Sequence, residues 1–273
     1  MAVTQNQLAS KTLNILLVTS ISFGVYFVLD ELYFGKLRQW LDRAIHQLGT
    51  SHILTYLIMG IPIYLGTLLM HRVKGALDSL GLTRSLLEGI IAPLIFTLPM
   101  FIGYAWVFEF NAEVTFDKVA VGVIAAAFFE ELFFRGFLFG QLYRYTKIGF
   151  IPSILLGALL FASVHLYQSQ EVSILVGIFG ATFFGAVMFA WVYVEWGYNL
   201  WVPIFLHLFM NLSWMLFSVS DNAWGGNYAN IFRVSTILLT VILTIVYKKR
   251  KGIRLEVNRR TIWMKKEVLQ QSF

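Results

Sequence analysis

Long apolar runs separated by short polar segments recur along the chain. A membrane-spanning helix needs about 20 mostly apolar residues. The runs that approach this length are 12–29, 52–70, 86–108, 116–139, 150–167, 172–194, 200–219 and 231–247. The pattern therefore predicts an all-α fold, a polytopic transmembrane helical bundle with about eight membrane-spanning helices.

Local sequence features refine this prediction. Four prolines fall inside or at the ends of the runs, where they kink helices, namely Pro62, Pro93, Pro99 and Pro203. Gly177, Ala181 and Gly185 recur at four-residue intervals and predict close helix packing. Between the first two runs, residues 30–51 mix charges with apolar residues at helical spacing. This segment predicts a separate amphipathic helix on the membrane surface.

The composition agrees with a membrane protein. Hydrophobic residues make up 58% of the 273 residues and charged residues 13%, whereas a soluble domain is about a quarter charged. The chain has no cysteine. Disulfides, thiolate metal sites and a cysteine nucleophile are therefore excluded.

The net charge of +6 comes from the end of the chain, where residues 248–273 hold nine Lys or Arg and two Glu. We interpret 1–247 as the integral-membrane domain and 248–273 as a basic cytoplasmic tail. Its position after an apolar run favours membrane lipid over nucleic acid as a partner. Segments 71–85 and 141–149 are also basic, whereas 109–117 is acidic. By the positive-inside rule, both termini are predicted to be cytoplasmic, in a cytoplasmic or reticular membrane.

Several ionisable or amide side chains lie within the predicted spans rather than at their ends. The fourth span contains Glu130, Glu131 and Arg135, the fifth His165, and the seventh His207 and Asn211. A charged residue at the bilayer centre costs roughly 2.5–3.5 kcal/mol on insertion scales. These residues therefore predict a functional site.

The spacing of the six residues suggests a chemical role for each of them. Residues four apart share a helical face, so Arg135 can pair with Glu131 while Glu130 remains a general base. His165 is expected to orient a water against Glu130, and His207 and Asn211 to stabilise an oxyanion. Together these roles describe amide hydrolysis without a covalent nucleophile. No cofactor is required in this interpretation.

A metal-dependent interpretation stays open at this point. Two histidines and a carboxylate form a known catalytic zinc set, here Glu130, His165 and His207. The His-Glu-x-x-His spacing of zinc metalloproteases is absent from the chain. The sequence does not choose between a water activated by glutamate alone and one activated by a divalent metal.

The same residues resemble a known family, the type II CAAX prenyl endopeptidases of the CAAX protease and bacteriocin-processing (Abi) family. The family pattern is Glu-Glu-x-x-x-Arg, Phe-x-x-x-His and His-x-x-x-Asn on separate membrane helices. The chain has all three blocks in order, at Glu130–Arg135, Phe161–His165 and His207–Asn211. Weaker similarities are Leu80-Gly-Leu and Asn199-Leu-Trp-Val-Pro. The motif-bearing core covers about 118–215.

The resemblance implies an intramembrane endopeptidase whose active site opens towards the cytoplasm. Its substrate would be a membrane-associated peptide or lipidated protein, prenylated or bacteriocin-like. It makes Glu130 the water-activating base with His165 as its partner, and places His207 and Asn211 at the oxyanion. Glu131 and Arg135 would support them. Many members are labelled metalloproteases, although a metal-free glutamate mechanism is also argued.

Two other classes of function remain as alternatives. Intramembrane Glu, His and Arg can form the relay of a proton-coupled transporter, although the chain shows no duplicated halves of the kind expected for transporters. A non-catalytic immunity or scaffold protein is the second alternative. Loss of function on Glu130→Gln distinguishes the enzyme from the scaffold.

Overall fold

A computed structural model describes residues 5–266 of the protein, and this part of the chain is mainly helical. The one β pairing in this part of the chain is an isolated bridge between Ile148 and Met264. The predicted all-α class is therefore confirmed. The first helices are α1 (Gln5–Ile45), α2 (Leu48–Met59), α3 (Ile61–Leu80), α4 (Leu86–Phe96) and α5 (Leu98–Val107). The later ones are α9 (Phe150–Ser163), η3 (Leu166–Gln168), α10 (Val172–Glu195), α11 (Trp201–Leu216) and α12 (Asn227–Arg250).

Between α5 and α9 the chain forms one continuous helical run from residue 116 to 145. Two π-helical stretches divide this run into α6 (Phe116–Val119), η1 (Ala120–Ala125), α7 (Ala126–Glu130), η2 (Glu131–Phe139) and α8 (Gly140–Tyr145). π-Helical turns are rare and occur frequently at functional sites. In this run, the boundary between α7 and η2 falls between Glu130 and Glu131.

The prediction of a separate amphipathic helix over 30–51 is wrong. Helix α1 continues without interruption for 41 residues, about 60 Å at about 1.5 Å per residue. The segment contains no proline, so nothing in the chain stops the helix until His46, which has a positive φ of 55°. Gln47 then caps α2 by accepting a hydrogen bond from the Thr50 amide at 2.5 Å.

Two predicted spans are bent at the positions of their prolines. Helices α2 and α3 meet at 43°, and α4 and α5 at 41°. Pro62 and Pro99 lie in the first turn of the second helix in each pair, where the missing N–H is tolerated but the preceding helix cannot continue. Pro93 lies inside α4, and Pro203 lies in the first turn of α11. Neither of these two helices is broken there.

The predicted number of eight spans is not confirmed. In the described residues, four helices are long and apolar enough to cross a membrane, or six if each bent pair counts as one span. Two predicted spans are not among them. The run 116–145 is divided by its π-helical stretches, and α11 has only 16 residues.

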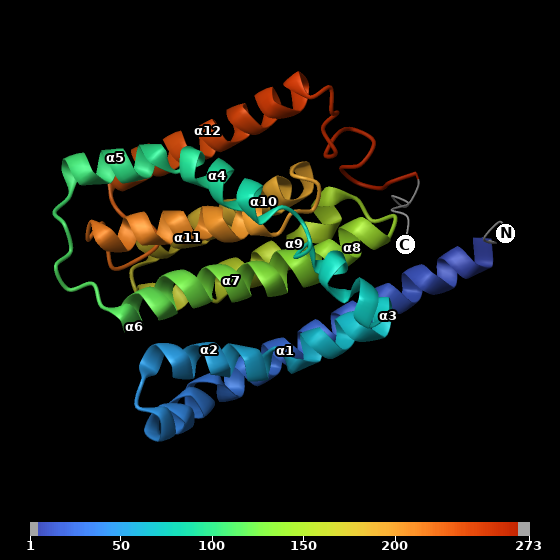
Figure 1. The fold of residues 1–273 in the computed structure, drawn as a ribbon, viewed down its shortest axis with the longest axis horizontal. Helices are drawn as coiled ribbons and strands as arrows, with labels where there is room; N and C mark the ends of the chain where they lie inside the picture. Colours follow the sequence, from blue (N-terminus) through green and yellow to red (C-terminus); the bar gives the residue numbers. More distant parts are fainter. Residues whose placement is uncertain (1–4, 267–273) are drawn as a thin grey trace.

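The helices form a bundle around the run 116–145 (Figure 1). Helices α1, α2 and α3 lie along one side of this run, and α4, α5 and α12 lie on the other side, beyond α11. The start of α1 and the segment 251–266 lie at the same end of the bundle. We call this end, which also carries the connections 81–85, 146–149 and 196–200, the terminal end. The opposite end, with connections 108–115, 164–171 and 217–226, is called the distal end.

The segment after α12 is docked against the terminal end rather than extended away from it. The carbonyl groups of Trp263, Thr261 and Ile262 accept hydrogen bonds from the amides of residues 149, 150 and 151 at 2.9–3.0 Å. These are the unpaired N–H groups at the start of α9. Lys248, which we expected at the lipid surface, is only 5% exposed and is paired with Glu195 at 2.5 Å. The last residues of the predicted tail, 267–273, lie outside the described part of the chain.

Candidate active site

The two adjacent glutamates of the run 116–145 have different surroundings. Glu130 ends α7 and its side chain is 22% exposed, whereas Glu131 begins η2 and its side chain is fully buried. Every residue of η2 is buried. The helix therefore presents one carboxylate to open space and holds the other in the packed interior.

Glu131 contacts two basic side chains of different helices. Its Oε1 atom lies 3.2 Å from Arg135 Nη1 and 2.9 Å from His207 Nδ1. The four-residue spacing thus pairs Glu131 with Arg135, and α11 adds His207 to the pair. Removing one partner of a buried ion pair typically costs about 3–5 kcal/mol. This chain of contacts consequently fixes the orientation of the His207 ring.

The guanidinium of Arg135 also contacts two aromatic rings. It lies over Phe161 at 4.5 Å and over Phe189 at 5.4 Å from the ring centroids, and the residue is 1% exposed. Cation–π contacts of this kind are strongest where water is excluded. Phe161, the first residue of the second motif, therefore contacts and stabilises Arg135, the last residue of the first motif.

The other ring nitrogen of His207, Nε2, points toward Glu130. Because Nδ1 faces the Glu131 carboxylate, it donates its hydrogen there, and Nε2 is left toward Glu130 Oε2 at 4.0 Å. This distance is too long for a direct hydrogen bond. A single water about 2.8 Å from each atom would bridge them. His207 Nε2 can donate a hydrogen bond only when the ring carries both protons.

The predicted span 150–167 contains His165, but α9 ends at Ser163 and His165 lies two residues beyond it, just before η3. Its Nδ1 lies 2.6 Å from the carbonyl oxygen of Phe161, and the two rings are in contact at 4.6 Å. A carbonyl can only accept, so Nδ1 carries the hydrogen and the lone pair of the neutral ring is on Nε2. The Phe-x-x-x-His spacing thereby determines the tautomer.

Asn211 lies one turn after His207 on α11. Its Nδ2 donates to the carbonyl oxygen of Gly122, in η1, at 3.0 Å. The side-chain amide has two N–H hydrogens, so one remains for another acceptor. The contact also ties α11 to the helix that carries Glu130.

These side chains share one cavity of about 710 Å³. Glu130, His165, His207 and Asn211 line it, whereas Glu131 and Arg135 lie behind its wall. The structure thus brings together residues from three separate sequence blocks, as the three motifs predict. Four of the six candidates face the cavity, and the other two hold one of those four in place.

The cavity lies in the distal half of the bundle. Its lining includes Tyr167 and Gln168 of the connection 164–171 and residues 220–223 of the connection 217–226. Tyr167 is 80% exposed and Asp221 is also exposed, so they form the rim. From the sequence we expected cytoplasmic termini and, from the family resemblance, a cavity that opens towards the cytoplasm. These two expectations exclude each other in this fold, because the rim of the cavity and the described ends of the chain lie at opposite ends of the bundle.

The stripe of small residues on α10 has a different role from the one predicted. An added Cβ at Gly185 would meet nothing within 4 Å, and Ala181 and Gly185 both line the cavity. Gly177 contacts Trp224, which belongs to a connection rather than to a helix. The prediction of close helix packing is therefore wrong. The small side chains leave space in front of the site.

Among the ionisable residues of the cavity that the sequence analysis missed are His52, Asp221 and Arg233, of which Arg233 of α12 is the only one with a permanent positive charge. Its Nη1 donates to Asn230 Oδ1 at 3.0 Å, and its guanidinium lies over the Trp214 ring at 4.4 Å. No carboxylate of residues 5–266 forms an ion pair with it. Its position within the run 231–247 was the signal that could have found it, because intramembrane ionisable residues are functional candidates.

The donor set does not fit the zinc alternative. Among residues 5–266, no three His, Asp or Glu side chains are grouped as a metal ion requires. Because the Nδ1 atoms of His165 and His207 are directed to a carbonyl and a carboxylate, each ring has only Nε2 available as a ligand. We therefore derive no catalytic step through a metal.

Residues 111–213 match the family model described as type II CAAX prenyl endopeptidase Rce1-like. The Rce1-like segment contains all three motifs and ends just after Asn211, so the family resemblance is confirmed. No curated protein and no solved structure matches the chain. The match supports an enzyme of the CAAX-protease type and, with the apolar helices, an integral membrane protein.

Proposed function

We propose that the protein is an intramembrane endopeptidase that hydrolyses a peptide bond of a membrane-associated peptide or lipidated protein. The observation that carries this proposal is the partly exposed Glu130 carboxylate beside His207 in a cavity shared with His165 and Asn211. A general base must lie within reach of the water that it deprotonates. The 4.0 Å separation of Glu130 Oε2 and His207 Nε2 suits a water held between them.

In the proposed reaction, Glu130 removes a proton from this water as its oxygen attacks the peptide carbonyl carbon. The carbonyl oxygen becomes an oxyanion, which the second N–H of Asn211 and the Nε2–H of protonated His207 stabilise. Glu130 then gives its proton to the leaving amine as the C–N bond breaks. His165, whose Nε2 is an acceptor, orients the water.

The proposed oxyanion donor requires His207 to carry both ring hydrogens. With His207 protonated, the cations Arg135 and His207 balance the carboxylates Glu130 and Glu131. Glu131 contacts both cations directly, and charge-assisted hydrogen bonds are about twice as strong as neutral ones. The two residues behind the cavity wall therefore support the donor in front of it.

The test is cleavage of quenched fluorescent peptides by detergent-purified protein, with a library that includes and omits a farnesylated cysteine. We expect Glu130→Gln to lower kcat about 10²–10⁴-fold, the range of general-base catalysis, and His165→Ala to lower it as well. Glu113→Gln is the matched control, because Glu113 is exposed and lies outside the cavity. A chelator arm tests metal dependence.

Equal cleavage by the wild type and both site variants would reject the assigned residues. Absence of cleavage by the wild type would favour the alternatives, a scaffold or a proton-coupled transporter. Loss of activity on chelation, restored by zinc alone, would contradict the metal-free mechanism.

A further inference from the structure

The bundle is closely packed between Glu130 and the terminal end. Behind Glu130, the whole of η2 is buried, and so are Gln141, Tyr143 and Arg144 of α8. None of the cavity-lining residues belongs to the connections of the terminal end. Within the described residues, the cavity therefore gives a substrate no access to Glu130 from the terminal end.

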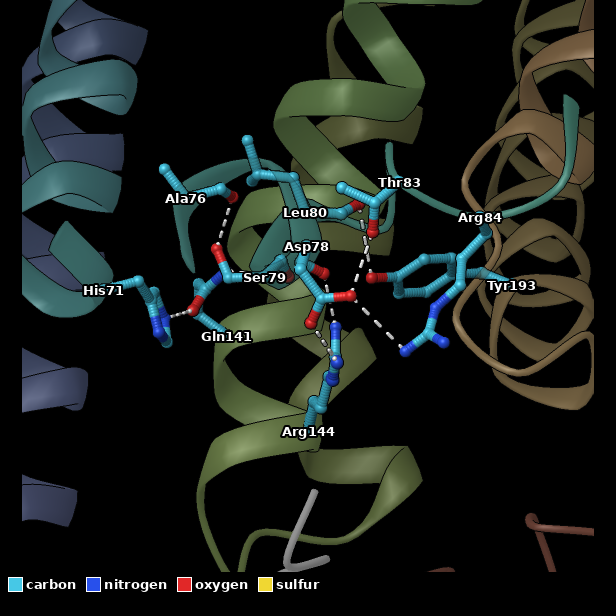
Figure 2. Close-up of polar contacts among 10 residues, drawn as sticks. All are labelled: His71, Ala76, Asp78, Ser79, Leu80, Thr83, Arg84, Gln141, Arg144 and Tyr193. Atoms are coloured by element: carbon cyan, nitrogen blue, oxygen red, sulfur yellow. Dashed lines mark hydrogen bonds and ion pairs between the residues drawn. The ribbon is translucent and has the colours of Figure 1, made fainter. Parts of the chain in front are cut away.

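A partly buried polar network lies at this closed end (Figure 2). Arg144 donates to the carbonyl oxygen of Asp78 at 2.7 Å and to its carboxylate at 2.9 Å. Gln141 donates to the Ser79 carbonyl oxygen at 3.3 Å and accepts from His71 Nε2 at 2.6 Å. These contacts hold α3 against α8 at the terminal end. Opening this end would leave buried polar groups without partners.

The two ends also differ in charge. The distal connections 108–115, 164–171 and 217–226 contain acidic residues and no Lys or Arg. The terminal end carries Arg84, Lys147 and the basic segment 251–266. The part of α1 near the distal end is mixed, with three basic and three acidic residues between 30 and 43. By the positive-inside rule the terminal end faces the cytoplasm.

We propose that the catalytic cavity opens to the extracytoplasmic side of the membrane, through the rim formed by Tyr167 and Asp221. This inference rests on the proposed function, and it restricts the class of substrate that the enzyme can cleave. The peptide bond must be presented from the extracytoplasmic side, as in a secreted peptide or an outward-facing segment of a membrane protein. A prenylated chain end in the cytoplasm does not reach Glu130.

The absence of cysteine from the chain permits a direct test with single-cysteine variants in intact cells. Ala126→Cys lies in the cavity one turn before Glu130, and Ala223→Cys lies at its rim. Lys251→Cys, exposed at the terminal end, is the control for the opposite side. Cells are treated with a small membrane-impermeant thiosulfonate cation, and the remaining thiols are counted with a fluorescent maleimide after solubilisation.

We expect the reagent to block Ala126→Cys and Ala223→Cys in intact cells, and to block Lys251→Cys only after permeabilisation. Modification of Ala126→Cys from the same side as Lys251→Cys would overturn the proposal. Protection of Ala126→Cys in both intact and permeabilised cells would also overturn it, because the cavity would then not be open to water.

Cleavage measurements separate this inference from the proposed function. A membrane-impermeant peptide that the detergent-purified enzyme cleaves is added to right-side-out or inverted vesicles. We expect cleavage at least 10-fold faster with right-side-out vesicles, and the reverse ratio would reject the side assigned. If the labelling follows the expectation but no peptide is cleaved in detergent, the proposed function fails while the orientation of the cavity stands.

Discussion

Arg233 is a membrane-embedded cation that lines the cavity without an ion-pair partner among the described residues. Its contacts to Asn230 and Trp214 leave further N–H groups, since a guanidinium has five donors. Such a group favours a carboxylate, which it can bind through two parallel hydrogen bonds. At the residue scale, this makes Arg233 a candidate for recognising an anionic group of the substrate.

We expect Arg233→Gln to weaken binding of an apolar peptide with a free C-terminal carboxylate about 10–100-fold, because hydrogen bonds to charged groups contribute about 1.5–3 kcal/mol. Binding is measured by fluorescence titration of the Glu130→Gln variant, so that no cleavage occurs. Arg233→Lys should retain part of the affinity. The C-terminally amidated peptide is the control, and an equal loss for acid and amide would reject this role.

The sequence located the polar side chains of the candidate site but not their hydrogen-bond partners. Glu130, Glu131, Arg135, His165, His207 and Asn211 were recognised because polar groups are costly in an apolar span. The pairing of Glu131 with Arg135 followed from their spacing on one helix. The contact of Glu131 with His207, which directs Nε2 to Glu130, joins residues 76 positions apart. No local pattern determines such a contact.

At the scale of elements, the connection 81–85 explains why two weaker parts of the family resemblance occur together. Gly81 has a φ of 84°, and its carbonyl oxygen accepts from the Leu200 amide at 3.1 Å. Trp201 Nε1 donates to the Leu82 carbonyl oxygen at 3.0 Å. The segment Leu80–Leu82 and the approach to α11 therefore form one contact, which positions the helix that carries His207.

Gly81→Ala should destabilise the protein. A left-handed conformation costs an L-residue about 1–2 kcal/mol, and the added Cβ would lie 2.2 Å from the Tyr198 carbonyl oxygen. Overpacking adds about 1–3 kcal/mol. The measurement is the free energy of unfolding in detergent. Gly24→Ala is the control, because its Cβ would meet nothing within 4 Å; an equal effect of both substitutions would contradict the argument.

Element boundaries show where local patterns are reliable. Pro62 and Pro99 correctly marked two bends, because a proline acts on its own helix. The amphipathic pattern over 30–51 did not mark a separate helix, since periodicity describes a face and not a break. Gly185 and Ala181 looked like packing residues, but whether small side chains admit a helix or leave a cavity depends on what lies opposite them.

At the scale of the whole molecule, Glu195 ties the end of α10 to α12 and to the segment 251–266. Its buried carboxylate accepts from Lys248 Nζ at 2.5 Å, from the Glu256 amide at 3.0 Å and from the Val257 amide at 2.8 Å. The first contact is a buried ion pair, and the other two fix the chain that leaves α12. One side chain thus docks the C-terminal segment.

We expect Glu195→Gln to release residues 251–266, because Lys248 would remain buried without a countercharge, at a cost of about 3–5 kcal/mol. Limited trypsin digestion with mass spectrometry should show faster cleavage after Arg259 and Arg260. The exposed Glu171→Gln is the matched control. The double variant Glu195→Leu/Lys248→Met should restore part of the protection. Unchanged cleavage in Glu195→Gln would contradict the assigned role.

The sequence by itself determined the class of the protein, its helical runs, the six polar residues and the family, because hydropathy, spacing and motifs are properties of short segments. Only the tertiary structure decided that Glu131 orients His207, that Arg233 lines the cavity and that residues 251–266 dock on α9. It also decided that the cavity lies at the distal end. Each of these depends on which faces of distant helices meet, and side-chain packing across the bundle, rather than any local pattern, selects those faces.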